Sequence, residues 1–333
     1  MYEVSKCAAQ EALRDLDRSF QNFFRGLKQG QKIGFPAFKR RGDRDSFRLT
    51  GTIKIQGKRV QLPRLNTINL KEISKVKGKI LSATVSREAD RWYVSITVEE
   101  EIMDPKPVSG KGIGIDVGLT SFATFSDGSK VIAPKPLNKN LKRIKIVSRK
   151  HSRKVLGSNN RKKSAQRLAR AHRDNRNIRK DFLHKETTKL AKTKSVIVIE
   201  DLDVKNMLEN NRLSRNISDA GWSEFRRMLE YKTKWYGSKL IIAPRYFPSS
   251  KTCSECGYCI SELPLSIREW QCEKCHIIHD RDVNAAKNLL KFSTGSSPGI
   301  YACGDTSNGA SQKLASYVPL KQEANNGIFV HKL

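Results

Sequence analysis

Long apolar segments are missing from this sequence. No run approaches the roughly 18 apolar residues of a membrane-spanning helix, and the N-terminus does not show the charged-then-apolar order of a secretory signal peptide. These absences argue against an integral membrane protein and against export. We therefore expect a soluble protein of the cytoplasm, associated with the nucleoid if its partner is DNA.

Acidic residues are also scarce. The 333 residues include 64 lysines and arginines but only 33 aspartates and glutamates, which leaves a formal net charge of +31. Such an excess destabilises a compact fold by self-repulsion unless a polyanion neutralises it. Nucleic acid is the expected partner. An anionic membrane surface is the competing explanation, and the lack of any spanning segment argues against it.

Cysteines are few, yet four of the seven are arranged as two Cys-x-x-Cys pairs. Cys253 and Cys256 are separated by fifteen residues from Cys272 and Cys275. In a large basic chain without an export signal, this spacing favours a zinc site over disulfides. Four thiolates close the coordination shell of zinc, so the predicted ion is structural.

Three neighbouring residues leave details of this zinc site open. Cys256 and Cys259 form an equally valid pair, although using it would leave Cys253 without a role. His276 and His279 are weaker ligand candidates. Glycine follows the first Cys-x-x-Cys pair, as such a turn prefers, whereas His276 follows the second and is expected in a strained conformation.

The apolar periodicity changes along the chain. Residues 6–28 place leucine and phenylalanine at helical spacing, which predicts an amphipathic helix. Residues 46–100 alternate apolar and polar side chains between turn residues, which predicts a small antiparallel barrel or sandwich. A proline-containing linker at 103–110 then leads to a second unit.

The second unit is predicted to mix strands and helices. Three short strands begin near residue 112, helices with a break at 157–160 occupy 137–190, and the apolar run at 195–202 predicts a strand covered on both faces. A helix at 220–236, a strand at 239–244 and a last helix from about Arg281 follow. The fold class is therefore α/β.

Three acids fall at particular points of this order. Asp116 lies on the first strand of the second unit, Glu200 ends the apolar run, and Asp282 opens the last helix. The first and fourth strands of such an order can be neighbours in an open sheet. Asp116 and Glu200 are then expected to face one another, with Asp282 reaching in from a helix packed on the sheet.

Converging carboxylates raise each other's pKa, and divalent cations relieve that repulsion. Two Mg²⁺ ions about 3.5–4 Å apart can activate a water and stabilise the leaving oxygen of a phosphodiester. A metal-dependent nuclease site is therefore predicted; the alternative is ordinary capping, such as Asp282 at a helix N-terminus. Asp201 should point away from Glu200 if the strand continues, and Asp280 and Asn284 are candidate neighbours of the metal.

The helices of the second unit are strongly basic. Residues 135–194 contain 22 lysines and arginines and three acids. Because the helices also keep apolar residues for packing, phosphate contact is favoured over a merely solvated face, and affinity should depend steeply on salt. The candidates for backbone contact, which would position a strand without recognising bases, are Arg161, Lys162, Lys163, Arg167, Arg170, Arg173 and Arg176.

Four ordered motifs carry a family resemblance. They are "GIDVGLTSFATFSDG", "VIVIEDLDVKNM", "RYFPSSKTCSECGY" and "CEKCHIIHDRDVNAAKNL". With them the chain resembles, over about residues 5–325, the TnpB (OrfB) proteins of bacterial insertion sequences, which are relatives of the type V CRISPR effectors and of the eukaryotic Fanzor proteins.

This resemblance implies a fold and an activity. It implies an RNase H-like, RuvC-type nuclease with an inserted zinc ribbon, preceded by a wedge barrel and a helical recognition region. It also implies cleavage of double-stranded DNA beside a short transposon-adjacent motif, directed by a guide RNA from the element's end. By motif, the catalytic acids that bind Mg²⁺ are Asp116, Glu200 and Asp282, and the zinc ligands are Cys253, Cys256, Cys272 and Cys275.

The expected organisation follows from motifs and resemblance together. Because the chain begins directly at the helix of residues 6–28, it is expected to be shortened at its N-terminus by roughly one barrel strand and some helices. The expected segments are a partial recognition segment (1–30), the wedge-like barrel (31–108), the nuclease unit (109–250) with its basic insertion (137–190), the zinc ribbon (251–279), the last helix (280–292) and a disordered tail (293–333).

Other function classes compete with the nuclease. A regulator or transposon remnant that binds RNA or DNA without cutting would not need three acids. A transposase that joins strands would need a strand-transfer arrangement that the sequence does not display. A zinc-ribbon interaction protein likewise leaves the acids unexplained.

Overall fold

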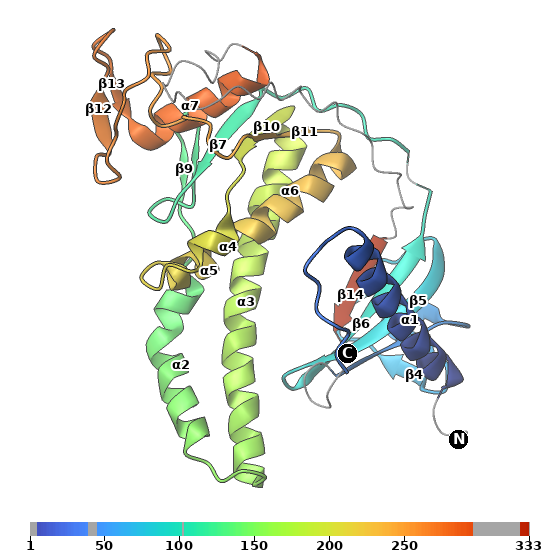
Figure 1. The fold of residues 1–333 in the computed structure, drawn as a ribbon. Helices are drawn as coiled ribbons and strands as arrows, with labels where there is room; N and C mark the ends of the chain where they lie inside the picture. The colour runs from blue at the N-terminus through green and yellow to red at the C-terminus, as the bar shows by residue number, and fades with distance from the viewer. Residues whose placement is uncertain (1–4, 39–44, 102, 296–326, 333) are drawn as a thin grey trace. The chain divides into compact units, whose positions relative to one another are not determined.

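The computed structural model describes residues 5–38, 45–101 and 103–295, and the backbone of 327–332. The chain divides into two compact units (Figure 1). Unit 1 comprises Met1–Met103, His151–Arg173 and Leu314–Leu333, and unit 2 comprises Asp104–Lys150 and Asp174–Lys313. Among the described residues, no helix is long and apolar enough to cross a lipid bilayer.

Unit 1 contains the helix predicted at residues 6–28 and antiparallel strands in the region of alternating pattern. Its core is formed by side chains that alternate along the strands, among them Val94, Ile96 and Val98. The elements are α1 (Lys6–Lys28), β1 (Ser46–Leu49), β2 (Lys54–Gln56), β3 (Arg59–Leu62), β4 (Asn66–Asn69), β5 (Lys79–Glu88) and β6 (Arg91–Glu99).

These strands form two sheets, one of order β2-β3-β4 and one of order β1-β5-β6-β14. The last strand, β14 (Gly327–Lys332), pairs antiparallel with β6. The prediction of disorder from residue 293 to the end does not hold for this segment, because its backbone pairs with β6. Residues 296–326 lie outside the described part of the chain.

Unit 2 is built on a five-stranded mixed sheet of order β11-β10-β7-β8-β9. Strands β7, β10 and β11 run parallel to one another. Strand β8 pairs antiparallel with β7, and β9 pairs antiparallel with β8. The strands are β7 (Ile113–Val117), β8 (Ala123–Phe125), β9 (Lys130–Val131), β10 (Val196–Glu200) and β11 (Lys239–Ala243).

Strand β10 is covered on both faces, as its apolar run predicts. Ile197 and Ile199 pack in one apolar cluster with Phe225 and other helical side chains. Val198, which points to the other face, packs with Leu289. The helices of unit 2, some of which continue into unit 1, are α2 (Pro136–Ser152), α3 (Asn159–Thr193), α4 (Val204–Met207), α5 (Ser214–Ala220), α6 (Trp222–Tyr236) and α7 (Arg281–Ser293).

The segment between β11 and α7 folds around the cysteines. Its hairpin consists of β12 (Glu269–Gln271) and β13 (Ile278–Asp280), which pair antiparallel. A small core of Leu263, Trp270 and the buried Cys253 and Cys272 fills its interior. Strand β13 leads without a linker into α7, so this segment fixes where the last helix begins.

Candidate functional site

Asp116 and Glu200 lie at the carboxyl ends of two neighbouring parallel strands, Asp116 as the next-to-last residue of β7 and Glu200 as the last of β10. Ile115 of β7 lies opposite Ile199 of β10, so the next residue on each strand is one of the two acids. The predicted adjacency of these strands is confirmed. Both acids stand at the carboxyl ends of parallel strands, the edge at which α/β sheets bind ligands.

Asp282 lies in the first turn of α7, whose start is fixed by Asp280. The Asp280 carboxylate accepts hydrogen bonds from the backbone N–H groups of Asp282 and Val283, both at 3.0 Å. Lys130 of β9 donates to the other oxygen of Asp280 at 2.6 Å. Asp280 therefore caps α7 and binds Lys130 at the edge of the sheet, so both of its carboxylate oxygens have partners within the protein.

Helix α7 lies unusually close to β7. A Cβ atom placed on Gly114 would fall 2.0 Å from the carbonyl oxygen of Ala286. Only glycine on the strand allows this approach, and small Ala285 and Ala286 on the helix are buried against it. This contact sets the depth of α7 over the sheet and with it the position of Asp282.

The three acids interact electrostatically. Burial, followed by the charges of Asp282 and Glu200, raises the pKa of Asp116 to about 8. Burial also raises the pKa of Glu200 to about 7, with a contribution from Asp201. Carboxyl groups that hold their protons this strongly lack sufficient positive charge around them.

The expectation that Asp201 points away from Glu200 applied to a strand that continues past Glu200, but strand β10 ends there. Both residues line one cavity. Asp201 pairs with Arg226 and, at 3.1 Å, with Arg245. The carboxylate of Asp201 therefore forms ion pairs with two arginines and is not one of the three converging acids.

One residue near the acids was missed by the sequence analysis. Arg268, just before β12, places Nη1 3.6 Å from Oδ1 of Asp282. Its guanidinium also lowers the pKa of Asp116 against the effect of burial. No motif or spacing signals this role, because only the fold of the cysteine segment brings Arg268 to the start of α7.

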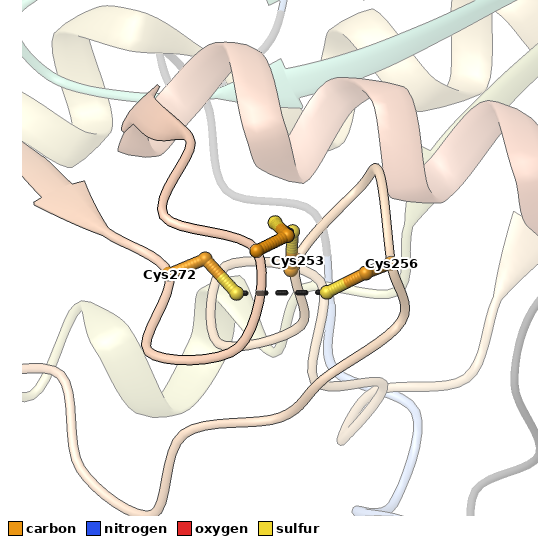
Figure 2. A group of neighbouring side chains, drawn as sticks. Cys253, Cys256 and Cys272 are labelled. Atoms are coloured by element: carbon orange, nitrogen blue, oxygen red, sulfur yellow. Dashed lines mark hydrogen bonds between the residues drawn. The ribbon is translucent and has the colours of Figure 1, made fainter.

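The four cysteines of the two Cys-x-x-Cys pairs converge, and Figure 2 shows three of them, Cys253, Cys256 and Cys272. Their sulfur atoms all lie within 4.8 Å of one another; among the described residues, no other set of three or more His, Cys, Asp or Glu side chains gathers as a candidate metal group. The Cys253–Cys275 and Cys256–Cys272 sulfurs are 3.6 Å and 3.5 Å apart. Tetrahedral zinc with bonds of about 2.3 Å needs sulfurs about 3.8 Å apart, so the cluster fits a structural zinc.

The two cysteine turns have the same backbone geometry. Gly257 donates its N–H to the carbonyl of Cys253 at 3.0 Å, and His276 donates to that of Cys272 at 2.9 Å. Gly257 has φ of 75° and His276 has φ of 60°. The strained conformation predicted for His276 is confirmed.

Neither histidine belongs to the four-thiol cluster, and Cys259 also lies outside it. His279 is 5% exposed, and its Nε2 lies 3.0 Å from the sulfur of Cys253. The ring also packs against Trp270. His279 is thus a buried neighbour of Cys253 and not a member of the candidate zinc site.

Asn284 and Asn288 attach the cysteine segment to α7. The Asn284 amide donates to the Thr252 carbonyl at 2.7 Å and accepts from the Ser254 N–H at 2.8 Å. Asn288 donates to the Ser249 carbonyl at 2.8 Å. Asn284 therefore joins the cysteine segment to α7, and these bonds use both its amide nitrogen and its oxygen.

The residues predicted to contact phosphates differ in how exposed they are and in whether they have partners within the protein. Lys162, Lys163, Arg167 and Arg176 are exposed on α3. Arg161 instead donates to the carbonyl of Lys154 at 2.9 Å and closes the turn between α2 and α3.

Two of these arginines meet an acid within unit 1. Asp90, at the turn between β5 and β6, pairs with Arg170 at 3.1 Å and with Arg173 at 2.8 Å. Arg170 is half exposed, but Arg173 is 5% exposed. The assignment of Arg173 to phosphate contact does not fit this burial, so we withdraw it.

Comparisons with known proteins agree with these motifs. Residues 93–211 match the OrfB_IS605 family model, described as "Probable transposase", and residues 222–289 match the Cas12f1-like TNB domain. A "Putative RNA-guided DNA endonuclease" of Streptomyces pristinaespiralis is 41% identical over 310 residues, which cover 91% of this chain and 74% of that protein. The chain belongs to the TnpB (OrfB) family.

A second relative is described by the same activity. The "Putative RNA-guided DNA endonuclease InsQ" of Escherichia coli (strain K12) is 35% identical over 331 residues, or 94% of this chain and 78% of InsQ. A solved Cas12f1–sgRNA–target DNA complex aligns with a TM-score of 0.40 and 18% identity, over 80% of this chain and 74% of that one. That structural likeness is too low to carry an argument.

Proposed function

We propose that this chain is an RNA-guided, Mg²⁺-dependent DNA endonuclease of an IS605-type insertion sequence. The RNA-guided DNA endonuclease activity named for its TnpB-family relatives supports the proposal. The observation that carries it is the pair Asp116 and Glu200 at the ends of adjacent parallel strands, with Asp282 close enough to raise the pKa of Asp116. The mixed sheet that bears these acids supports an RNase H-like, RuvC-type fold.

The chemistry of the three acids suits divalent metal binding, although their oxygens are not gathered as closely as the four thiols are. Asp116 and Glu200 hold protons well above the ordinary carboxyl range because burial and neighbouring carboxylates oppose their ionisation. Asp116, Glu200 and Asp282 would hold the ions, whose charge lets all three ionise at neutral pH. When bound, two Mg²⁺ ions supply an activated water and neutralise the leaving oxygen of the phosphodiester.

The protein's own side chains would position the DNA strand for this reaction. Arg268 lies 3.6 Å from Asp282 and carries the positive charge needed to hold a phosphate beside that acid. Gly114 and the Asp280 cap keep α7, and so Asp282, over the sheet. The exposed Lys162, Lys163, Arg167 and Arg176 would contact guide RNA or DNA phosphates without recognising bases.

The zinc ion would support the site without reacting. Cys253, Cys256, Cys272 and Cys275 would fill all four coordination positions, which leaves none for water. The bonds from Asn284 and Asn288 connect this segment to α7. The zinc segment is therefore the support for Asp282 and Arg268.

Co-purified RNA provides the test. RNA bound to the purified protein would be sequenced, and a DNA duplex matching it would be incubated with the complex and Mg²⁺. We expect cleavage by the wild type, none by Asp116→Ala, and normal cleavage by the exposed Asp104→Ala control. Absence of cleavage by the wild type, or equal cleavage by Asp116→Ala, contradicts the proposal.

A further inference from the structure

A cavity of about 420 Å³ opens beside Glu200 within unit 2. It lies at the carboxyl ends of all three parallel strands. Its lining includes Val117, the last residue of β7, Glu200, the last residue of β10, and Arg245, two residues after β11. Its size falls within the range of small-ligand sites. Ligands of α/β sheets bind at this edge.

The lining of this cavity is electrically balanced. Four acids, including Asp201 and Asp203, face four bases, including Arg226 and Arg245. Arg245 binds Asp203 at 3.0 Å and Asp201 at 3.1 Å, and Asp201 also binds Arg226. A free phosphate would find no excess of positive charge here, whereas a neutral polar group would find donors and acceptors side by side.

Part of the wall is apolar and aromatic. Leu202, Trp222 and Phe225 contribute to it. Trp222 is 5% exposed, and its indole nitrogen has no hydrogen-bond partner among the described residues. A buried N–H without a partner is uncommon and costs stability. An amphipathic, flat ligand with an acceptor atom would suit a wall of this kind.

From these observations we propose that the cavity is a subsite for one nucleobase of the DNA strand being cut. The occupant is neutral, so it matches the balanced lining, and flat and partly apolar, so it fits beside the apolar edge that Leu202, Trp222 and Phe225 contribute. Because Glu200 lines the same cavity, the base belongs to a nucleotide flanking the phosphodiester at the three acids. The inference rests on the proposed nuclease function for that strand.

The Arg226–Asp201–Arg245 group presents guanidinium and carboxylate edges together at this subsite. Such edges can pair with the polar rim of a base. Removing the base of the bound nucleotide should weaken binding by about 5- to 150-fold, the range that one good pairing of side-chain polar groups with a base edge gives.

The test uses the whole protein with its co-purified RNA and a matching DNA target that contains a pre-opened bubble. The strand that is not paired with the guide carries one abasic nucleotide, moved position by position through the bubble. Equilibrium binding is measured in EDTA, which prevents cleavage, and the cut position is mapped separately with Mg²⁺.

We expect one abasic position, next to the mapped cut, to weaken binding of the wild type by about 5- to 150-fold. Arg226→Gln and Trp222→Phe should each reduce that penalty. Lys234→Gln should leave it unchanged, because Lys234 is an exposed cation of α6 outside the cavity lining. Trp222→Phe removes the indole N–H but keeps an aromatic ring in the core, so this variant tests the N–H with little change in packing.

The outcomes separate this inference from the nuclease itself. An abasic scan without any sensitive position overturns the base subsite, even if the protein cuts DNA. A sensitive position that all variants retain also overturns it. If uncharged methylphosphonate linkages, rather than abasic sites, reproduce the effect and the variants remove it, the cavity binds phosphate. A position-specific penalty without any cleavage in Mg²⁺ upholds the subsite and contradicts the proposed function.

Discussion

Nη1 of Arg268 lies 3.6 Å from Oδ1 of Asp282, which joins the cysteine segment to the last of the three acids. The same region is fixed by backbone pairing, since Arg281 donates its N–H to the carbonyl of Arg268 at 2.8 Å. A folded zinc segment therefore places a cation beside an acid that it does not itself contain. Zinc binding and phosphodiester cleavage are expected to be linked through this contact.

Replacing Arg268 should affect the reaction more than the fold. Arg268 is largely exposed, so Arg268→Gln should change the melting temperature little, while the loss of its charge should lower the cleavage rate by about 10- to 100-fold. Single-turnover cleavage with Mg²⁺ measures the effect. Lys274→Gln, an exposed cation of the same segment, is the control. Equal rates for the two variants would show that Arg268 has no role in the reaction.

Gly114→Ala should displace the last helix. The added methyl group would lie 2.0 Å from the Ala286 carbonyl oxygen, which is backbone and cannot rotate away. We expect a loss of stability of about 1–3 kcal/mol, typical of overpacking, together with slower cleavage. Gly34→Ala controls for the added methyl group itself, since Gly34 has open space around it and no left-handed φ. Wild-type cleavage by Gly114→Ala would mean that α7 tolerates a shift.

Removal of zinc should detach the support of Asp282. Cys272 is fully buried in the cluster, and Cys272→Ser is expected to release zinc and to inactivate the protein through misfolding of residues 251–279. Metal analysis and limited proteolysis of this segment measure the change. Cys7→Ser, at a thiol far along the chain from the cluster, is the control. Full cleavage by a zinc-free Cys272→Ser protein would contradict the supporting role.

Patterns of residue type predicted the zinc ligands and the adjacent acid-bearing strands. The spacing of Cys253 to Cys275 reports metal binding directly, and the apolar run before Glu200 predicts a strand covered on both faces. Arg268 could not be found in this way, because its role depends on how the cysteine segment folds. The burial of Arg173 was missed for a similar reason, since its partner Asp90 lies 83 residues away in the sequence.

Salt dependence should distinguish the basic residues of α3. Lys163 and Arg167 are exposed, and if each neutralises one phosphate, Lys163→Gln or Arg167→Gln should reduce the slope of log K against log salt by about 0.7–0.9. Arg173→Gln is the matched contrast, because it removes a buried ion pair with Asp90. It should lower the melting temperature without a comparable change in slope. Binding that is indifferent to salt would contradict phosphate contact altogether.

The raised pKa of Asp116 predicts a particular dependence of stability on pH. In the folded, metal-free protein its pKa is about 8, whereas the ordinary value is 3.8, so the folded state binds an extra proton between these values. Stability should therefore fall as pH rises from about 4 to about 8. Glu200, with a pKa of about 7, should act in the same direction.

Asp116→Asn isolates this effect because asparagine cannot ionise. At pH 8.5 in EDTA the variant should melt about 3–6 °C above the wild type, corresponding to an unfolding free energy higher by on the order of 1–2 kcal/mol. Below about pH 4 the difference should disappear, because Asp116 is then protonated in the folded and in the unfolded wild type alike. Mg²⁺ should stabilise the wild type at pH 8.5 but not the variant, since the ion replaces the missing positive charge. Asp104→Asn, at an exposed acid, should change none of these melting temperatures. A wild type whose stability is flat from pH 5 to pH 8.5 in EDTA would remove the electrostatic basis for placing metal ions at these acids.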